Sequence, residues 1–215
     1  NQSFFINNAK IEAVQTFCYL GFDLKASGVL SQGIKTLHDK TNKAMRPLKG
    51  VLSRFNIPVK IALKLFHTYI EPIVLYTSEC WSVLSDKNIL NFNDDTLTGD
   101  KDIFKVDNLH RQFLKYTLGT SKSYPNLAIY GELGEIPISL KAYRLMINYW
   151  YRTNSLPTTS LAKLALLENI HLKTNWIKTV ENIIRFFNLT EIPSTVSKFK
   201  TKVYFNIQNK YIDNW

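Results

Sequence analysis

The chain has 215 residues, of which 45% are hydrophobic and 20% are charged, and these proportions exclude a wholly disordered protein. Lysine and arginine outnumber aspartate and glutamate by 27 to 17, and the resulting net charge of +10 predicts a polyanionic partner. Two distant cysteines exclude a disulfide framework, and the four histidines have no metal-ligand spacing.

The sequence also restricts where the protein works. It contains no run of about 18 apolar residues, so we expect no membrane-spanning segment and no membrane partner. The sparse cysteines are typical of a reducing compartment, and we expect an intracellular protein of the nucleus or cytoplasm. The first residue is Asn1 and no leader sequence follows it, so we expect the chain to be a fragment of a longer polypeptide.

Residues 3–24 have the pattern of short strands. Phe4–Ile6 and Ile11–Val14 flank Asn7-Asn8, a pair that tolerates the positive φ of a tight hairpin turn. Phe17–Leu24 then alternates as one strand that contains a glycine, which would let a ligand or another backbone approach closely. In that strand one face is expected to hold Cys18, Leu20, Phe22 and Leu24. The sequence therefore predicts three short strands at the edge of a larger sheet.

From Ser31 onward the apolar spacing becomes helical. A helix begins at Ser31, its stripe runs to Phe55, and Pro47 should kink or split it. A second helix, with Pro58 in its first turn, should run to Trp81 with an interruption at Pro72. Further helices are expected over Val106–Leu118, 125–134, 137–153, Ser160–Ile170, Asn175–Asn188 and from Ser194 to the end. The predicted fold class is mainly α, a helical bundle with a small N-terminal antiparallel β segment.

Most of the positive charge lies in one window. Eight basic residues and one aspartate lie between Ser31 and His67, which gives this window a net charge of +7. The predicted nucleic-acid-binding residues are Lys35, Lys43, Arg46 and Arg54 on roughly one helical face, together with Lys40 and Lys49. A second cluster consists of Lys198, Lys200, Lys202 and Lys210. A merely solvated helix face is the alternative, and phosphate contacts alone would give no sequence specificity.

One short motif matches the sequence of a known type of catalytic site. Phe92–Asp95 spells aromatic-x-Asp-Asp, the string with which template-directed polymerases hold two Mg²⁺ ions on a hairpin. The residues that follow, 96–102, are polar and turn-prone, whereas such a hairpin needs apolar strands. We therefore interpret residues 86–105 as an acidic surface loop, and we predict neither catalytic nor metal-binding residues in this chain.

Four stretches in order resemble non-LTR (LINE-type) retrotransposon reverse transcriptases. They are 17–22 (FCYLGF), 67–81 (HTYIEPIVLYTSECW), 113–119 (FLKYTLG) and 125–134 (PNLAIYGELG). The first is similar to a Tyr-Leu-Gly strand of that family, and the second to a thumb helix that ends in Leu-Tyr-Gly-x-Glu-x-Trp. Thr77 stands where that motif has glycine. Asn175–Lys178 and Asp213–Trp215 also fit one animal branch.

The resemblance implies a division of the chain. Residues 1–28 would be C-terminal strands of the palm, 29–120 thumb helices with an acidic loop at 86–105, and 121–215 a post-thumb helical region. Tyr19, Leu20 and Gly21 would lie near the primer terminus. The family's catalytic aspartates would precede this chain, so Mg²⁺ would belong to the parent enzyme, and we expect the chain to be inactive alone.

The expected function is therefore that of a non-catalytic part of an RNA-directed DNA polymerase. It would hold an RNA–DNA or double-stranded template–primer duplex through its backbone and contact the palm and fingers of the same polypeptide. The alternative is a host-domesticated helical interaction module without polymerase function. An intact upstream Asp-Asp in the same transcript would favour the polymerase.

Overall fold

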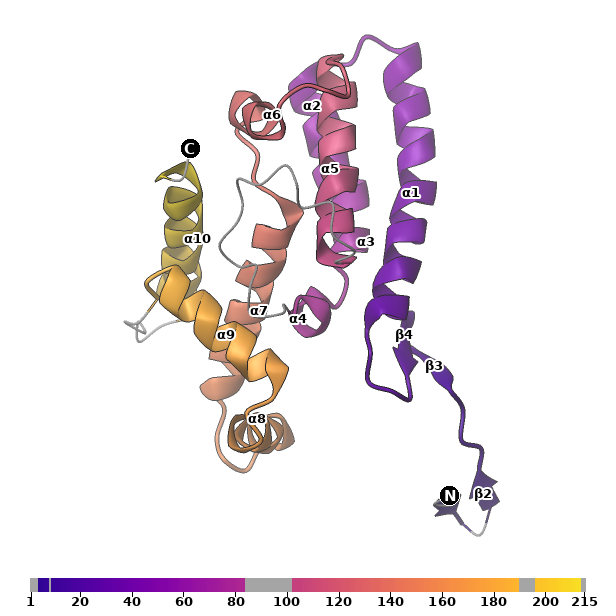
Figure 1. The fold of residues 1–215 in the computed structure, drawn as a ribbon, viewed down its shortest axis with the longest axis vertical. Helices are drawn as coiled ribbons and strands as arrows, with labels where there is room; N and C mark the ends of the chain where they lie inside the picture. Colours follow the sequence, from indigo (N-terminus) through magenta and orange to yellow (C-terminus); the bar gives the residue numbers. More distant parts are fainter. Residues whose placement is uncertain (1–3, 8, 84–101, 190–195, 214–215) are drawn as a thin grey trace.

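The computed structural model describes residues 4–7, 9–83, 102–189 and 196–213 and shows a mainly α-helical protein with small N-terminal β-hairpins (Figure 1). The predicted fold class is thereby confirmed. The strands are β1 (Phe4–Ile6), β2 (Ala9–Ile11), β3 (Thr16–Tyr19) and β4 (Phe22–Lys25). The helices are α1 (Ser31–Arg54), α2 (Val59–Leu65), the π-helix η1 (Phe66–Ile70), α3 (Glu71–Val74), α4 (Ser78–Trp81), α5 (Asp102–Leu118), α6 (Asn126–Leu133), α7 (Ile138–Asn154), α8 (Leu161–His171), α9 (Asn175–Phe186) and α10 (Val196–Asp213).

Helix α7 is the centre of the core. It contacts α4, α5, α8, α9 and α10, and α1 joins the assembly through α5 and α3. Among its fully buried side chains are Leu140, Tyr143, Met146 and Ile147. Apolar burial of this kind supplies the main favourable free energy of folding, so the long helices form one body around α7.

The N-terminal strands differ from the prediction. Residues 17–24 form a two-stranded hairpin instead of one strand, because Leu20 and Gly21 both have positive φ and reverse the chain. The register pairs Tyr19 with Phe22, so the predicted common face of Cys18, Leu20, Phe22 and Leu24 is wrong. The β1–β2 hairpin projects away from the helices, with every described residue exposed (Figure 1).

Helix α1 is continuous and contains Pro47 within it. The helix therefore does not split at that proline, and the other predicted outcome, a kink, stays a prediction. The predicted stripe does face inward, since Ile34 and Leu37 are buried and Leu48 and Leu52 are half-buried. Met45, which is not part of the stripe, is buried as well. Phe55, the last residue of the stripe, is instead mostly exposed, because the helix ends at Arg54 and the backbone becomes extended.

The predicted second helix consists of several pieces. α2, η1 and α3 follow one another without a gap, and Pro72 lies directly after the π-helical turn, as the second residue of α3. Thr77, with φ of 53°, separates α3 from α4. The apolar spacing of this segment predicts that Ile61 and Tyr69 face inward, but both side chains are exposed.

The C-terminal helices follow the predicted order closely. α6 and α5 both end before a left-handed glycine, Gly134 and Gly119, as their sequences indicated. α5 begins at Asp102, so the last four residues of the predicted loop 86–105 are helical. The other residues of that predicted loop, 86–101, include Phe92–Asp95 and lie outside the described residues. In the described part of the chain, no helix is both long and apolar enough to cross a membrane.

Candidate nucleic-acid interface

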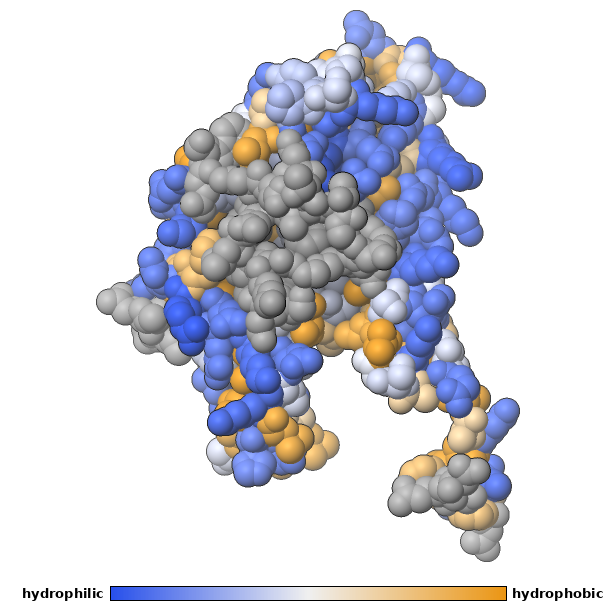
Figure 2. All heavy atoms as spheres, viewed as in Figure 1, coloured by the Kyte–Doolittle hydropathy of each residue, from blue (hydrophilic) through white to orange (hydrophobic). Residues whose placement is uncertain are grey.

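The outward face of α1 carries the predicted basic residues. Lys35, Lys43, Arg46 and Arg54 are all exposed, and they lie opposite the buried face of the same helix. Figure 2 shows hydrophilic side chains gathered along this edge of the molecule. Within the described part of the chain, none of these four side chains forms an ion pair with a carboxylate. The face is therefore a positive surface whose four cations form no ion pair with a described carboxylate.

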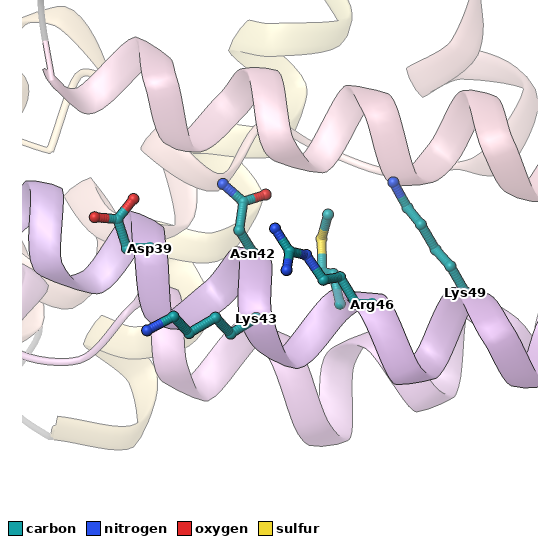
Figure 3. A pocket seen from close by; sticks show the side chains of 6 residues that line it. Asp39, Asn42, Lys43, Arg46 and Lys49 are labelled. Carbon is teal, nitrogen blue, oxygen red and sulfur yellow. The ribbon is translucent and has the colours of Figure 1, made fainter.

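A groove of about 480 Å³ runs beside this face. Its lining side chains come from α1, and Figure 3 shows them along one stretch of the helix. They are Asp39, Asn42, Lys43, Met45, Arg46 and Lys49. Because its lining contains three cations and one carboxylate, the groove has a net positive charge, which suits an anionic ligand.

Lys49 lies where the groove meets α5. Its ammonium nitrogen lies 5.5 Å from the ring centroid of Tyr116, and the Tyr116 hydroxyl donates to the Lys49 carbonyl at 3.0 Å. Partial burial lowers the pKa of Lys49. The residue therefore fastens α1 to α5 and also presents a partly desolvated positive charge.

A second groove, of about 500 Å³, continues from Lys49 across α5 to the loop before α6. Arg111, Lys115 and Lys122 lie along it, and the Lys115 ammonium donates to the Lys122 carbonyl at 2.9 Å. The sequence analysis missed these residues. Arg111 and Lys115 are four residues apart, and this spacing was the available signal for a basic helix face.

The hairpin tip is fixed by two hydrogen bonds from other elements. The Lys40 ammonium donates to the Gly21 carbonyl at 2.9 Å, and the Tyr76 hydroxyl donates to the Leu20 carbonyl at 2.5 Å. Tyr19 and Leu20 nevertheless keep exposed side chains, and Leu20 is 72% exposed. Lys40 therefore has a structural role at the hairpin, which sets it apart from the four outward-facing cations.

The same hairpin is seated on the first turns of α1. Phe22 is only 5% exposed, and its ring lies directly over Gly33. The Thr36 hydroxyl donates to the Asp23 carboxylate at 2.7 Å. The absence of a side chain at Gly33 thus provides the space that the Phe22 ring fills.

A partly buried polar cluster joins η1 and α3 to α7. His67 contacts Glu71 at 2.5 Å and Glu135 at 2.8 Å, one carboxylate on each ring nitrogen. The Lys141 ammonium lies 2.8 Å from Glu71 and 3.4 Å from Glu135. Two cations and two carboxylates therefore alternate in one network. Only His67 and Glu71, four residues apart, gave any sign of this cluster in the sequence.

The network shifts the titration of its members. Hydrogen bonds to Glu135 and Glu71 raise the pKa of His67 to about 9. Burial alone would raise the pKa of Glu71, but the hydrogen bond to His67 and the charge of Lys141 lower it to about 2. The nearby His110 is fully buried, and burial lowers its pKa well below the ordinary value. His67 is thus held as a cation, and its neighbour His110 as a neutral ring.

Other candidate sites contribute less. The second basic cluster lies on α10, on the side of the molecule away from α1 (Figure 1). Among the described residues, no group of three or more histidine, cysteine, aspartate or glutamate side chains has the geometry to hold a metal ion. The basic surface formed by α1 and its two grooves is therefore the candidate functional site.

Comparison with protein families, with curated proteins and with solved structures gave no match to this chain.

Proposed function

We propose that this chain corresponds to the palm edge, thumb and post-thumb region of a LINE-type reverse transcriptase, and that it holds a template–primer duplex by its backbone. The observation that carries the proposal is the outward face of α1. Lys35, Lys43, Arg46 and Arg54 lie there without a described carboxylate partner. Such a face suits the evenly spaced phosphates of a duplex, and it gives affinity without sequence specificity.

Contacts between the stretches that carry the resemblance also support the proposal. Tyr76, in the stretch 67–81, donates to Leu20 in the stretch 17–22. The Trp176 indole donates to the Glu79 carbonyl at 2.7 Å, so a third quoted segment joins the second. Segments that are far apart in the sequence thus contact one another, as parts of one functional unit would.

The backbone at Thr77 offers independent support. Its φ of 53° is a left-handed conformation that glycine adopts without steric cost and that a β-branched residue rarely adopts. The motif Leu-Tyr-Gly-x-Glu-x-Trp has glycine at this position. The conformation therefore agrees with the family pattern even though the residue departs from it.

The test is the salt dependence of binding to a B-form DNA duplex, measured beside an RNA–DNA hybrid. Each phosphate contact should contribute about −0.9 to the slope of log K against log salt on a B-form duplex, so four contacts give roughly −3 to −4. Replacing Lys35, Lys43, Arg46 and Arg54 with glutamine should flatten this slope and weaken binding to every sequence about equally. The matched control removes the same charge elsewhere, through Lys173→Gln, Lys178→Gln, Lys198→Gln and Lys200→Gln.

An interaction module is the second candidate, and one feature of α8 favours it. Leu161 is 83% exposed, and Leu164 in the same helix and Leu172, directly after its end, are also exposed. Exposed apolar side chains in a group are typical of protein contacts. If the variant without the four α1 charges binds the hybrid as the parent does, the basic face is solvated surface only, and the interaction module becomes the better proposal.

A further inference from the structure

The groove between α1 and α5 has a composition that phosphate binding alone does not require. Lys49, Lys115 and Lys122 supply positive charge, and none of the described residues that line it is acidic. Uncharged polar side chains lie among these cations: Asn108, Gln112, Thr120 and Asn126. Arg111 also lines the groove, but it influences the titration of the buried Asp107, so we assign it to the wall and not to the ligand.

The amide groups indicate what else the ligand offers. A phosphate only accepts hydrogen bonds, and a lysine satisfies it. A carboxamide both donates and accepts, and so does the ribose 2′-hydroxyl, the group that distinguishes RNA from DNA. Asn108 and Gln112 are exposed and lie one helical turn apart on α5, so their side chains are neighbours on one face.

We propose that this groove binds one single-stranded RNA segment along its sugar–phosphate backbone. Lys49, Lys115 and Lys122 contact phosphates, and the Asn108 and Gln112 amides contact 2′-hydroxyls of neighbouring nucleotides. The inference rests on the proposed function, since both require a polynucleotide on the α1 surface. A recess between two helices suits one strand, whereas the convex face of α1 suits the outer surface of a duplex.

Tyr116 adds an aromatic surface to the same groove. Its hydroxyl is engaged by the Lys49 carbonyl, and its side chain remains 40% exposed. An exposed ring beside a row of cations is a usual stacking platform for unpaired bases, and it tolerates any sequence. The groove therefore combines charge, sugar recognition and stacking in one place.

The experiment compares oligo(U) with oligo(dU) of equal length on the full chain, because with these bases the probes differ only in the 2′-hydroxyl. We expect oligo(U) to bind about tenfold more tightly, as two net hydrogen bonds would give. Asn108→Ala with Gln112→Ala should bring the ratio of the two affinities close to one without changing the salt slope. Both replacements favour helix at exposed sites, so folding is preserved. Asn209→Ala, an exposed amide on α10, is the control.

A second variant separates charge from sugar recognition. Lys115→Gln with Lys122→Gln should weaken both probes equally and keep the preference for oligo(U). Equal binding of oligo(U) and oligo(dU) by the parent chain, or a preference that persists in the Asn108 and Gln112 variant, overturns the inference. If double-stranded DNA or a hybrid still binds through the α1 charges in that case, the proposed function stands while the RNA groove fails. Loss of both activities would reject both.

Discussion

The Tyr76 hydroxyl donates a 2.5 Å hydrogen bond to the Leu20 carbonyl and thereby ties the end of α3 to the tip of the β3–β4 hairpin. Lys40 holds the next carbonyl, that of Gly21, from α1. Both carbonyls belong to turn residues and point out of the hairpin ladder. Helix α1 and the turn after α3 thus supply hydrogen-bond partners that the hairpin itself lacks.

Removing the Tyr76 hydroxyl should loosen the hairpin without unfolding the helices. In Tyr76→Phe we expect the amides of Phe22 and Leu24 to exchange roughly five to ten times faster, which corresponds to the loss of about 1 kcal/mol. Tyr69→Phe is the control, because the Tyr69 side chain is exposed on η1. Unchanged exchange in Tyr76→Phe would mean that the Phe22 contact alone seats the hairpin.

Two glycines of α1 should respond in opposite ways to alanine. A Cβ at Gly33 would overlap the Phe22 ring, whereas a Cβ at Gly50 would meet no atom. We expect Gly50→Ala to raise the free energy of unfolding by about 1 kcal/mol through helix propensity. Gly33→Ala should instead displace Phe22 and cost about 1–3 kcal/mol by overpacking. Denaturant unfolding of both variants measures the difference, and stabilisation by Gly33→Ala would contradict this packing.

Local signals in the sequence predicted most of the helical fold. Gly119 and Gly134 marked helix ends that the structure confirms, because left-handed termini need glycine. The apolar spacing also placed α7 and α10 correctly, since amphipathic helices bury one face. The outward position of Lys35 and Arg46 followed from the same periodicity.

Features that depend on tertiary contacts were not predictable. Leu20 alternates as a strand residue should, yet it has positive φ, and Tyr76 and Lys40 stabilise the turn from outside the hairpin. The second groove forms because α5 packs beside α1, and the sequence does not predict which helices pack together. Glu135 and Lys141 are remote from His67 in the chain, so no local sequence pattern predicted the polar cluster.

Thr77→Gly should stabilise the protein. Thr77 has a positive φ, and its buried hydroxyl has no hydrogen-bond partner among the described residues. Glycine would remove both the backbone strain and the unsatisfied hydroxyl, and we expect a net gain of about 1 kcal/mol. Ala165→Gly, at an exposed position within α8, should lose about 1 kcal/mol under the same conditions. A loss at both positions would refute the strain argument.

Stability should depend on pH through His67. The pKa of about 9 in the folded protein lies above the ordinary value of 6.5, so the protonated ring stabilises the fold fully below pH 6.5. This contribution is lost as the pH rises through 9. Glu71, with a pKa of about 2, contributes above 4.5 and loses its contribution as the pH falls through 2. Stability should therefore be greatest between about pH 4.5 and 6.5 as far as this pair is concerned.

His67→Gln provides the measurement. Urea unfolding between pH 6.5 and 9 should show falling stability in the parent chain and a flatter profile in the variant. His171→Gln, exposed at the end of α8, is the matched histidine control. The same decline in the parent and in His67→Gln would assign the pH dependence to other groups.

The π-helical turn at Phe66–Ile70 has a consequence for the number of residues in this segment. Ala62, Phe66, Ile70 and Val74 are buried at strict intervals of four, whereas an α-helix turns about 40° too far at each such interval. The wider π turn offsets part of this rotation and keeps the four side chains on the core. A π turn holds about one residue more than an α turn, so deleting one residue between 66 and 70 would restore an α-helix and leave Glu71 and Val74 facing nearly the same way. Shortening this segment by one residue should therefore be less harmful than lengthening it by one.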